Sequence, residues 1–213
     1  MMEQIKPIET EYNGYHFRSR LEARWAVFFD SLGVKYDYEP EGFLINGIYY
    51  LPDFYLPEVN GGTWVEVKGK MTSEDRDKIT AMQNALTPFF EEEAKELEKS
   101  GIYGHMLITV GKIPSEQDTL DIWEWYESVD DEWDYFSPGW DNWYWPCICP
   151  VCGKFGFEFE ARSARICSHT NEERLKAFHY SKEGKEGRFP DHPRILKAYR
   201  DARQARFEHG EKP

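Results

Sequence analysis

The chain has 213 residues, of which 40% are apolar and 31% charged, and this composition supports a packed core and excludes a disordered chain. No apolar run approaches the roughly 20 residues of a membrane-spanning helix. The first residues also lack the apolar segment of a secretory signal, so we expect a soluble, cytoplasmic protein with no membrane partner. In such a reducing compartment the four cysteines are expected to bind metal or to stay as free thiols.

The net charge of −13 is unevenly distributed along the chain. Residues 1–160 carry 13 Lys and Arg against 31 Asp and Glu, whereas residues 161–213 carry 13 against 8. Nucleic-acid-binding proteins usually present a basic surface, so the acidic part disfavours binding to nonspecific duplex. The C-terminal part could form a basic face.

In chain order, the first predicted element is an amphipathic helix over residues 17–32. Residues 34–70 are rich in β-branched and aromatic residues with Asn-Gly and Gly-Gly turns, which predicts antiparallel strands joined by hairpins. A second helix is expected over residues 73–99, capped by Ser73 or Thr72 and interrupted within its length by a proline. Residues 105–111 predict a buried strand. This order indicates a compact α/β (α+β) core.

The composition changes after this core. Residues 114–145 contain six of the eight tryptophans and are strongly acidic. We interpret them as a connector whose tryptophans pack a lid or a seam; a stacking platform for unpaired bases is the alternative, which the acidic surroundings disfavour. The predicted organisation is a first domain over residues 1–113, the connector over 114–145, and a small module over 146–213.

The strand predicted around residues 63–68 carries candidate catalytic groups. Alternation along a strand places Glu66 and Lys68 on one face. A hairpin turn near residues 60–61 would bring Asp53 opposite Glu66 on the neighbouring strand. Two adjacent carboxylates repel each other unless a cation lies between them, and such a pair suits Mg²⁺ or Mn²⁺. The alternative is an exposed Glu66–Lys68 ion pair with Asp53 as a turn residue.

A third carboxylate, Glu22, lies one turn after Arg18 in the first predicted helix. It borders the apolar stripe of that helix, so it needs a partner. That partner is either Arg18 or a metal ion at the site.

The combined pattern resembles a known family. Pro52-Asp53, a spacer of twelve residues and Glu66-Val67-Lys68, preceded by a helix bearing Glu22, resemble the PD-(D/E)XK nuclease superfamily. Within it, the pattern is similar to small phage- and transposon-associated endonucleases, which include relatives of Holliday-junction resolvases. The resemblance covers residues 10–111.

The resemblance implies a restriction-endonuclease-like core, a mixed sheet flanked by helices. It implies a divalent-metal-dependent endonuclease that hydrolyses DNA phosphodiester bonds in the cytoplasm of a bacterial or phage-infected cell. Asp53, Glu66 and the Val67 carbonyl would bind the Mg²⁺ or Mn²⁺, and Glu22 would either complete the site or support its ligands without touching the ion. Lys68 would be catalytic, and Gln83 would line the site from the following helix. DNA would be the partner, and paired cuts would require a homodimer or an accessory protein.

The second half contains a metal-binding pattern. The two-residue spacer of Cys149-Pro-Val-Cys152 lets both thiolates face one tetrahedral ion. Cys167 and His169 could supply the other two ligands, with Cys147 and His179 as competitors for the fourth place. We expect a structural Zn²⁺ that stabilises a small module; four unligated cysteines in a core are the alternative.

Residues 193–207 predict a basic helix, which is either a solvated surface or a contact to the DNA backbone. Two further functions stay open beside the general endonuclease. One is a structure-specific junction resolvase or nickase. The other is a non-enzymatic, zinc-stabilised interaction module that binds a host protein.

Overall fold

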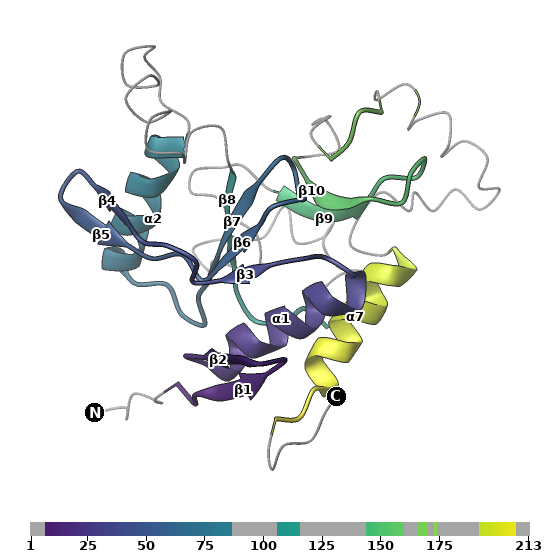
Figure 1. Ribbon diagram of the computed structural model, residues 1–213, viewed down its shortest axis with the longest axis horizontal. Coiled ribbons are helices and arrows are strands. Elements are labelled where there is room, and N and C mark those ends of the chain that lie inside the picture. Colours follow the sequence, from purple (N-terminus) through teal and green to yellow (C-terminus); the bar gives the residue numbers. More distant parts are fainter. Residues whose placement is uncertain are drawn as a thin grey trace, which may run out of the picture.

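The computed structural model describes residues 7–86, 106–115, 144–159, 166–169, 173 and 192–207 (Figure 1). Most of the tryptophan-rich connector, the second half of the helix predicted over 73–99, and His179 lie outside the described residues. Within the described part the chain is a mixed α+β protein, and none of the helices there is long and apolar enough to cross a membrane.

A four-stranded sheet in the order β3-β6-β7-β8 carries the predicted catalytic strand in its interior (Figure 1). β6 and β7 are antiparallel, whereas β7 and β8 are parallel, so the sheet is mixed. The strands are β3 (Asp37–Tyr38), β6 (Phe54–Leu56), β7 (Thr63–Val67) and β8 (Met106–Val110).

The connections on either side of β7 follow from local sequence. The β6–β7 turn uses Asn60, Gly61 and Gly62, which all have positive φ. Asn and Gly tolerate this left-handed region, and such a turn brings the two strands together as a hairpin. The parallel partner β8 lies beyond α2 (Ser73–Leu86), at whose start the hydroxyl of Thr72 accepts a hydrogen bond from the amide N–H of Asp75 at 3.2 Å.

Helix α1 (Arg20–Leu32) starts three residues later than the predicted range because Ser19 caps it. The Ser19 side chain accepts a hydrogen bond from the Glu22 amide, which satisfies one of the free N–H groups of the first turn. Gly33 ends the helix in the left-handed conformation with φ 71°.

The sheet separates two apolar clusters, because successive side chains of a strand point to opposite faces. Val65 and Ile108 belong to the larger cluster, which contains the buried side of α1. Trp64 and Leu107 belong to the smaller cluster, which contains the buried side of α2.

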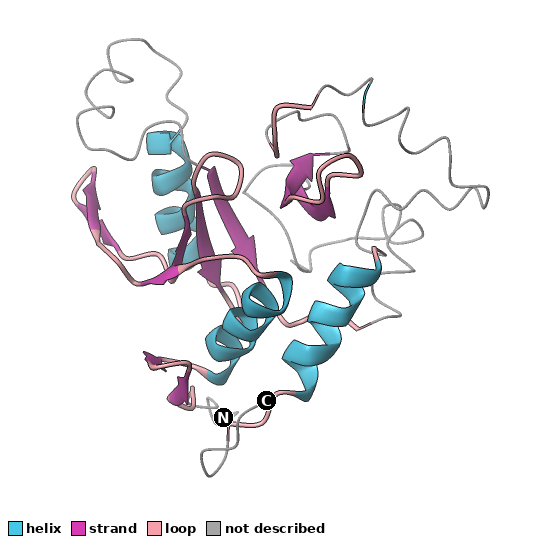
Figure 2. Cartoon of the chain, turned by 45° about the vertical axis from the view of Figure 1, so that its right-hand side comes forward, coloured by secondary structure: helices cyan, strands magenta, loops and turns pink. Residues whose placement is uncertain are grey.

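Three two-stranded hairpins complete the described strands (Figure 2). They are formed by β1 (Thr10–Tyr12) with β2 (Tyr15–Phe17), β4 (Phe43–Ile45) with β5 (Ile48–Tyr50), and β9 (Tyr144–Ile148) with β10 (Phe155–Phe159).

The larger cluster also contains side chains from the C-terminal part of the chain. Helix α7 (Pro193–Gln204) packs along α1, where the rings of Phe28 and Tyr199 stack with centroids 4.8 Å apart. Phe155 and Phe157 of β10 join the same cluster. Helix α7 and the aromatic residues of β10 therefore share a core with the first half of the chain, whereas Cys147, Cys149 and Ile166 form a small cluster of their own.

Candidate functional site

Asp53 and Glu66 lie side by side at the ends of neighbouring strands. Phe54 of β6 pairs with Val65 of β7, so the next positions outward, Asp53 and Glu66, face each other across the hairpin. Both are almost fully buried, with 2% and 4% of their surfaces exposed. The structure thus brings together the two carboxylates that the sequence pattern predicted to be neighbours.

Each oxygen of Asp53 has a protein partner. The Val67 amide N–H donates to Oδ2 at 2.7 Å, and the Arg18 guanidinium lies 2.7 Å from Oδ1. Burial raises the pKa of Asp53 well above its usual value, and the charges of Glu66 and Glu22 raise it further against the opposing effects of Val67 and Arg18. Asp53 is therefore a carboxylate whose charge the surrounding residues compensate incompletely.

Glu66 is held between a cation and a hydroxyl. Its Oε1 lies 2.7 Å from the Lys68 ammonium, and the Tyr50 hydroxyl donates to Oε2 at 3.0 Å. Burial raises the pKa of Glu66 despite these two partners. As on Asp53, the buried negative charge is costly and favours a further cation.

Lys68 lies between two carboxylates. Besides Glu66, its ammonium contacts Asp75 of α2 at 3.2 Å. Burial lowers the pKa of Lys68, but the charges and hydrogen bonds of Glu66 and Asp75 outweigh burial, so the pKa is raised. Lys68 is therefore a cation at neutral pH, suited to stabilising negative charge rather than to accepting a proton.

Glu22 is buried and fully engaged by α1 and its surroundings. Its Oε1 accepts a hydrogen bond from the Ser19 hydroxyl at 2.6 Å. Its Oε2 accepts hydrogen bonds from the Tyr38 hydroxyl at 2.6 Å and from the Arg18 amide at 3.1 Å. The partner expected at Arg18 is thus present, but through the backbone N–H; the Arg18 side chain extends to Asp53 instead.

The remaining predicted residues take different positions. Val67 contributes its amide to Asp53, and its side chain packs in the larger apolar cluster. Gln83 lies on α2 two turns beyond Asp75, which is about 12 Å along a helix axis. Gln83 is therefore displaced along α2 from the turn that contacts Lys68.

Thr109 is a buried residue of the site that the sequence pattern did not indicate. It pairs with Glu66 in the parallel β7–β8 register, so the two side chains share one face of the sheet. Only 6% of Thr109 is exposed, and among the described residues its Oγ1 has no hydrogen-bond partner. A buried hydroxyl without a partner beside a buried carboxylate points to an additional ligand, such as a water or an ion.

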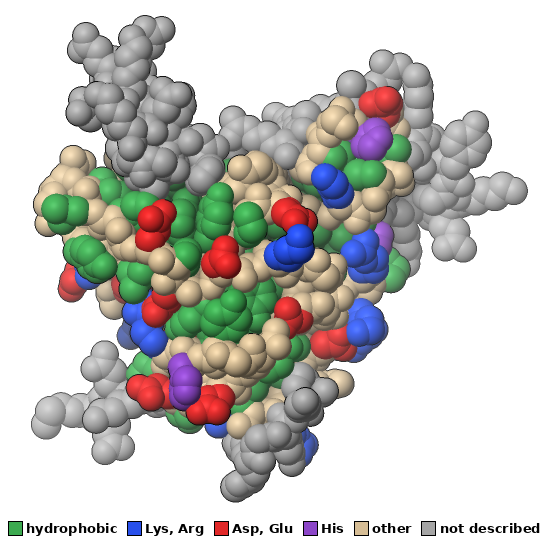
Figure 3. All heavy atoms as spheres, in the orientation of Figure 1, with side chains coloured by type: hydrophobic (Ala, Val, Ile, Leu, Met, Phe, Trp, Pro, Cys, Tyr) green, Lys and Arg blue, Asp and Glu red, His purple; other side chains and the backbone are tan. Residues whose placement is uncertain are grey.

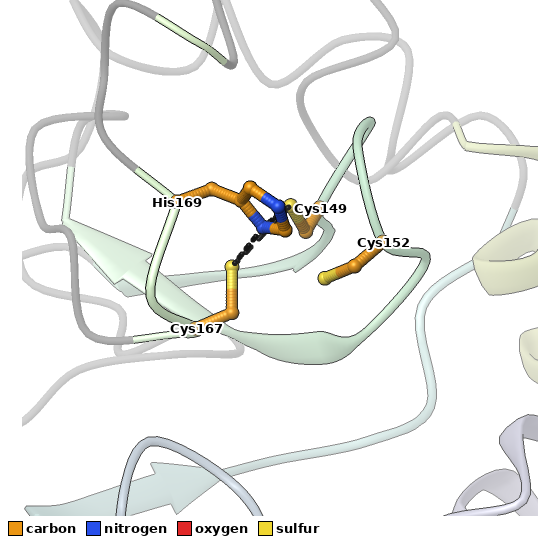
Figure 4. Close-up of side chains that lie close together, drawn as sticks. All are labelled: Cys149, Cys152, Cys167 and His169. Atoms are coloured by element: carbon orange, nitrogen blue, oxygen red, sulfur yellow. Dashed lines mark hydrogen bonds between the residues drawn. The ribbon is translucent and has the colours of Figure 1, made fainter.

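A second site lies at the end of the β9–β10 hairpin, where Cys149, Cys152, Cys167 and His169 converge (Figure 4). Their ligand atoms all lie within 4.8 Å of one another. Among the described residues, no other group of three or more Cys, His or carboxylate side chains is spaced this closely. Glu22, Asp53 and Glu66 are therefore too far apart to form such a group.

The local fold of the knuckle explains this convergence. Gly153 adopts φ 72°, and its amide donates to the Cys149 carbonyl at 2.8 Å, which closes a tight turn around the two-residue spacer. The Cys149 amide in turn donates to the Lys154 carbonyl at 2.8 Å. Both thiols of the turn are thereby directed to the same side.

The distances within the cluster agree with a tetrahedral metal site. The sulfurs of Cys149 and Cys167 lie 3.4 Å apart, and His169 Nδ1 lies 3.8 Å and 3.3 Å from them. Zinc bonds of tetrahedral geometry separate two sulfurs by roughly 3.8 Å, and a sulfur and a nitrogen by about 3.5 Å. The cluster could therefore hold a metal ion such as zinc.

The competitor Cys147 has a different role. It is buried next to the cluster, but its thiol donates to the Gly156 carbonyl at 3.3 Å across the hairpin. His169 therefore completes the group in the described residues, in agreement with the predicted ligand set. His179, the other competitor, lies outside the described residues.

Comparison of the chain with protein-family models, with curated proteins and with solved structures gives no match.

Proposed function

We propose that the protein is a divalent-metal-dependent DNA endonuclease of the PD-(D/E)XK type. The observation that carries the proposal is that buried Asp53, directly before β6, lies opposite buried Glu66 of β7, with Lys68 directly after β7 and in contact with Glu66. This is the constellation that the resemblance implies, and it occurs on a mixed sheet between α1 and α2.

The donor chemistry fits Mg²⁺ or Mn²⁺. Asp53 and Glu66 offer hard oxygen donors, and burial raises the pKa of both carboxyl groups, which favours a cation between them. The Thr109 hydroxyl, which lacks a partner among the described residues, lies beside Glu66 and could bind a coordinated water. The bound cation would polarise the scissile phosphate and activate water.

The protein residues around this cation have separable roles. Asp53 and Glu66 would orient it from two strands of a rigid sheet. Lys68, kept protonated by Glu66 and Asp75, would stabilise the negative charge that develops on the phosphate. Glu22 would act through its hydrogen bonds at the start of α1, which fix the backbone from which Arg18 reaches Asp53.

DNA is the proposed substrate despite the acidic composition. Figure 3 shows acidic and basic side chains interspersed over the face in view. A bound divalent cation would reduce the repulsion between phosphate and the carboxylates. The salt dependence of binding is therefore expected to be shallow compared with that of a protein that holds duplex through a basic surface.

In this proposal the ion of the Cys149, Cys152, Cys167 and His169 cluster is structural Zn²⁺. All four positions of a tetrahedral ion are taken by protein side chains, which leaves no position for a substrate. The cluster would fix the β9–β10 hairpin, whose Phe155 and Phe157 pack in the larger core.

Cleavage of supercoiled plasmid with Mg²⁺, with Mn²⁺ or without a divalent cation tests the proposal. We expect metal-dependent nicking or linearisation, and a loss of roughly 10²–10³-fold or more for Asp53→Asn and Lys68→Met. The matched control is Lys70→Met, which removes an exposed lysine two residues away and should keep activity. Full activity in Asp53→Asn would overturn the site assignment.

Substrate comparison separates the narrower alternatives. A junction resolvase would cut branched DNA, such as a four-way junction, much faster than single-stranded or linear duplex DNA, whereas a nickase would convert supercoiled plasmid to open circles without linearising it. No cleavage of any of these substrates, together with a stoichiometric host protein retained through purification, would favour the non-enzymatic interaction module instead.

A further inference from the structure

The guanidinium of Arg18 is a cation of the protein that contacts the buried carboxylate of Asp53. This group lies 2.7 Å from Asp53 Oδ1 and 2.5 Å from Glu39 Oε1. The Arg18 side chain is 56% exposed, whereas that of Asp53 is 3% exposed. A half-exposed cation thus covers one oxygen of a buried carboxylate.

Oδ1 is the Asp53 oxygen that a divalent cation could bind. Oδ2 is fixed by the Val67 amide at 2.7 Å, a bond within the rigid sheet. Among the described residues, Oδ1 contacts only the Arg18 side chain. A divalent cation that binds Asp53 through Oδ1 therefore competes directly with the guanidinium.

Glu39 provides a place for the displaced guanidinium. Its amide donates to the Asp53 carbonyl at 2.9 Å, and its backbone has φ 45°, in the left-handed region that residues other than glycine rarely adopt. This uncommon conformation keeps Glu39 next to Asp53. The Arg18 side chain therefore bridges two carboxylates and can leave one while keeping the other.

We propose that Arg18 is a built-in competitor for the catalytic divalent cation: it occupies Asp53 Oδ1 in the metal-free protein and moves off this oxygen, while Glu39 retains it, when Mg²⁺ or Mn²⁺ binds. This inference rests on the proposed function and concerns the regulation of the same site. It makes the metal affinity of the protein weaker than the two buried carboxylates alone would give. After displacement the guanidinium lies at the mouth of the site, where it can contact a phosphate.

In this competition a divalent cation replaces the Arg18 guanidinium at Asp53 Oδ1. In the metal-free protein Arg18 offsets part of the buried charge of Asp53, which stabilises the fold. Binding of a divalent cation removes this ion pair and replaces it with a stronger one. Removal of Arg18 should therefore tighten metal binding, which a purely structural role of Arg18 would not do.

Direct Mn²⁺ titration, with free Mn²⁺ followed by electron paramagnetic resonance, tests this without measuring cleavage. We expect Arg18→Gln to bind Mn²⁺ roughly three- to tenfold more tightly than the wild type, since the ion pair is half exposed and correspondingly modest. Arg20→Gln is the matched control: it removes the same charge two residues away and should change the affinity little. Arg18→Met, which keeps the apolar stem, serves as the second variant if Arg18→Gln does not fold.

A double-mutant cycle tests the part played by Glu39. Glu39→Gln should weaken Mn²⁺ binding in the wild type, because Arg18 then pairs with Asp53 alone, and much of this effect should disappear in the Arg18→Gln background. An affinity of Arg18→Gln equal to or weaker than that of Arg20→Gln would overturn the inference. The proposed function would still stand if the wild type binds Mn²⁺ and only Asp53→Asn loses this binding. If neither the wild type nor any variant binds Mn²⁺, both the inference about Arg18 and the proposed function are overturned.

Discussion

Asn60, in the turn between β6 and β7, is joined to the backbone of Phe157 in β10 by two hydrogen bonds. Its side-chain amide donates to the Phe157 carbonyl at 2.8 Å, and its Oδ1 accepts from the Phe157 amide at 2.8 Å. The turn that sets the register of Asp53 and Glu66 is therefore attached to the hairpin that carries the Cys/His cluster. Gly156 leaves room for this contact, since a Cβ there would lie 2.9 Å from Asn60 Oδ1.

Replacing Asn60 should destabilise the protein through this contact. Asn60→Gly keeps the freedom to adopt positive φ but removes both hydrogen bonds to the backbone of buried Phe157. We expect the free energy of unfolding, measured with urea, to fall by about 1–3 kcal/mol. Asn46→Gly is the matched control, because Asn46 also has positive φ, 51°, but lies exposed in the β4–β5 turn. Equal stability of the two variants would show that the contact contributes little.

Removal of the proposed zinc ion from the Cys/His cluster should affect the larger core rather than a separate module. Cys152→Ser should lose the bound zinc, measured as zinc per chain, and lower the thermal midpoint of the main unfolding transition, because Ile148, Phe155 and Phe157 pack beside α1. Cys147→Ser is the control: its hydroxyl can still donate to the Gly156 carbonyl, and zinc content should be unchanged. If Cys147→Ser loses zinc and Cys152→Ser keeps it, Cys147 is the zinc ligand in place of Cys152.

Asp75 should position Lys68 for the proposed reaction. Asp75→Asn keeps an oxygen for its hydrogen bonds with Thr72 but removes the charge that holds the Lys68 ammonium at 3.2 Å. We expect kcat of plasmid cleavage to fall by about three- to tenfold, with KM little changed, because the ammonium is less well placed. Glu74→Gln, which removes an adjacent exposed carboxylate paired with Lys78, should leave both constants as they are. A change confined to KM would argue that Asp75 affects DNA binding instead.

Local sequence patterns predicted the parts of the site that depend on local geometry. The turn near Asn60 and the alternation along β7 suffice to place Asp53 opposite Glu66, because a hairpin turn fixes the register of its strands. The two-residue spacer between Cys149 and Cys152 likewise predicts a knuckle.

Long-range contacts were not predictable in this way. The stacking of Phe28 on Tyr199 and the bonds between Asn60 and Phe157 join residues that are far apart in sequence, and no local spacing encodes them. Thr109 has no local signal either, since no sequence pattern separates a threonine in a buried strand that borders a site from ordinary β-sheet packing. Helix α1 starts later than the predicted residue 17 because Phe17 pairs with Thr10 in the β1–β2 hairpin and Ser19 caps the helix.

The buried charge on Asp53 should make the metal-free protein less stable as pH rises. Because its pKa is raised well above 3.8, Asp53 binds its proton more tightly in the folded than in the unfolded state. Its stabilising contribution is thus fully present below the unfolded pKa and is lost as pH rises through the folded pKa. Urea unfolding of the zinc-loaded protein without Mg²⁺ between about pH 5 and pH 8 measures this loss.

The matched variants isolate the contribution of this one carboxyl group. The unfolding free energy of Asp53→Asn should fall less steeply with pH than that of the wild type, by up to about 1.4 kcal/mol per pH unit within the window. For Asp37→Asn, at an exposed position of β3, the unfolding free energy should change with pH as steeply as in the wild type. Adding Mn²⁺ should flatten the wild-type profile, because a bound cation favours the ionised carboxylate. Parallel profiles for Asp53→Asn and the wild type, with and without Mn²⁺, would mean that Asp53 is already ionised and fully compensated by Arg18.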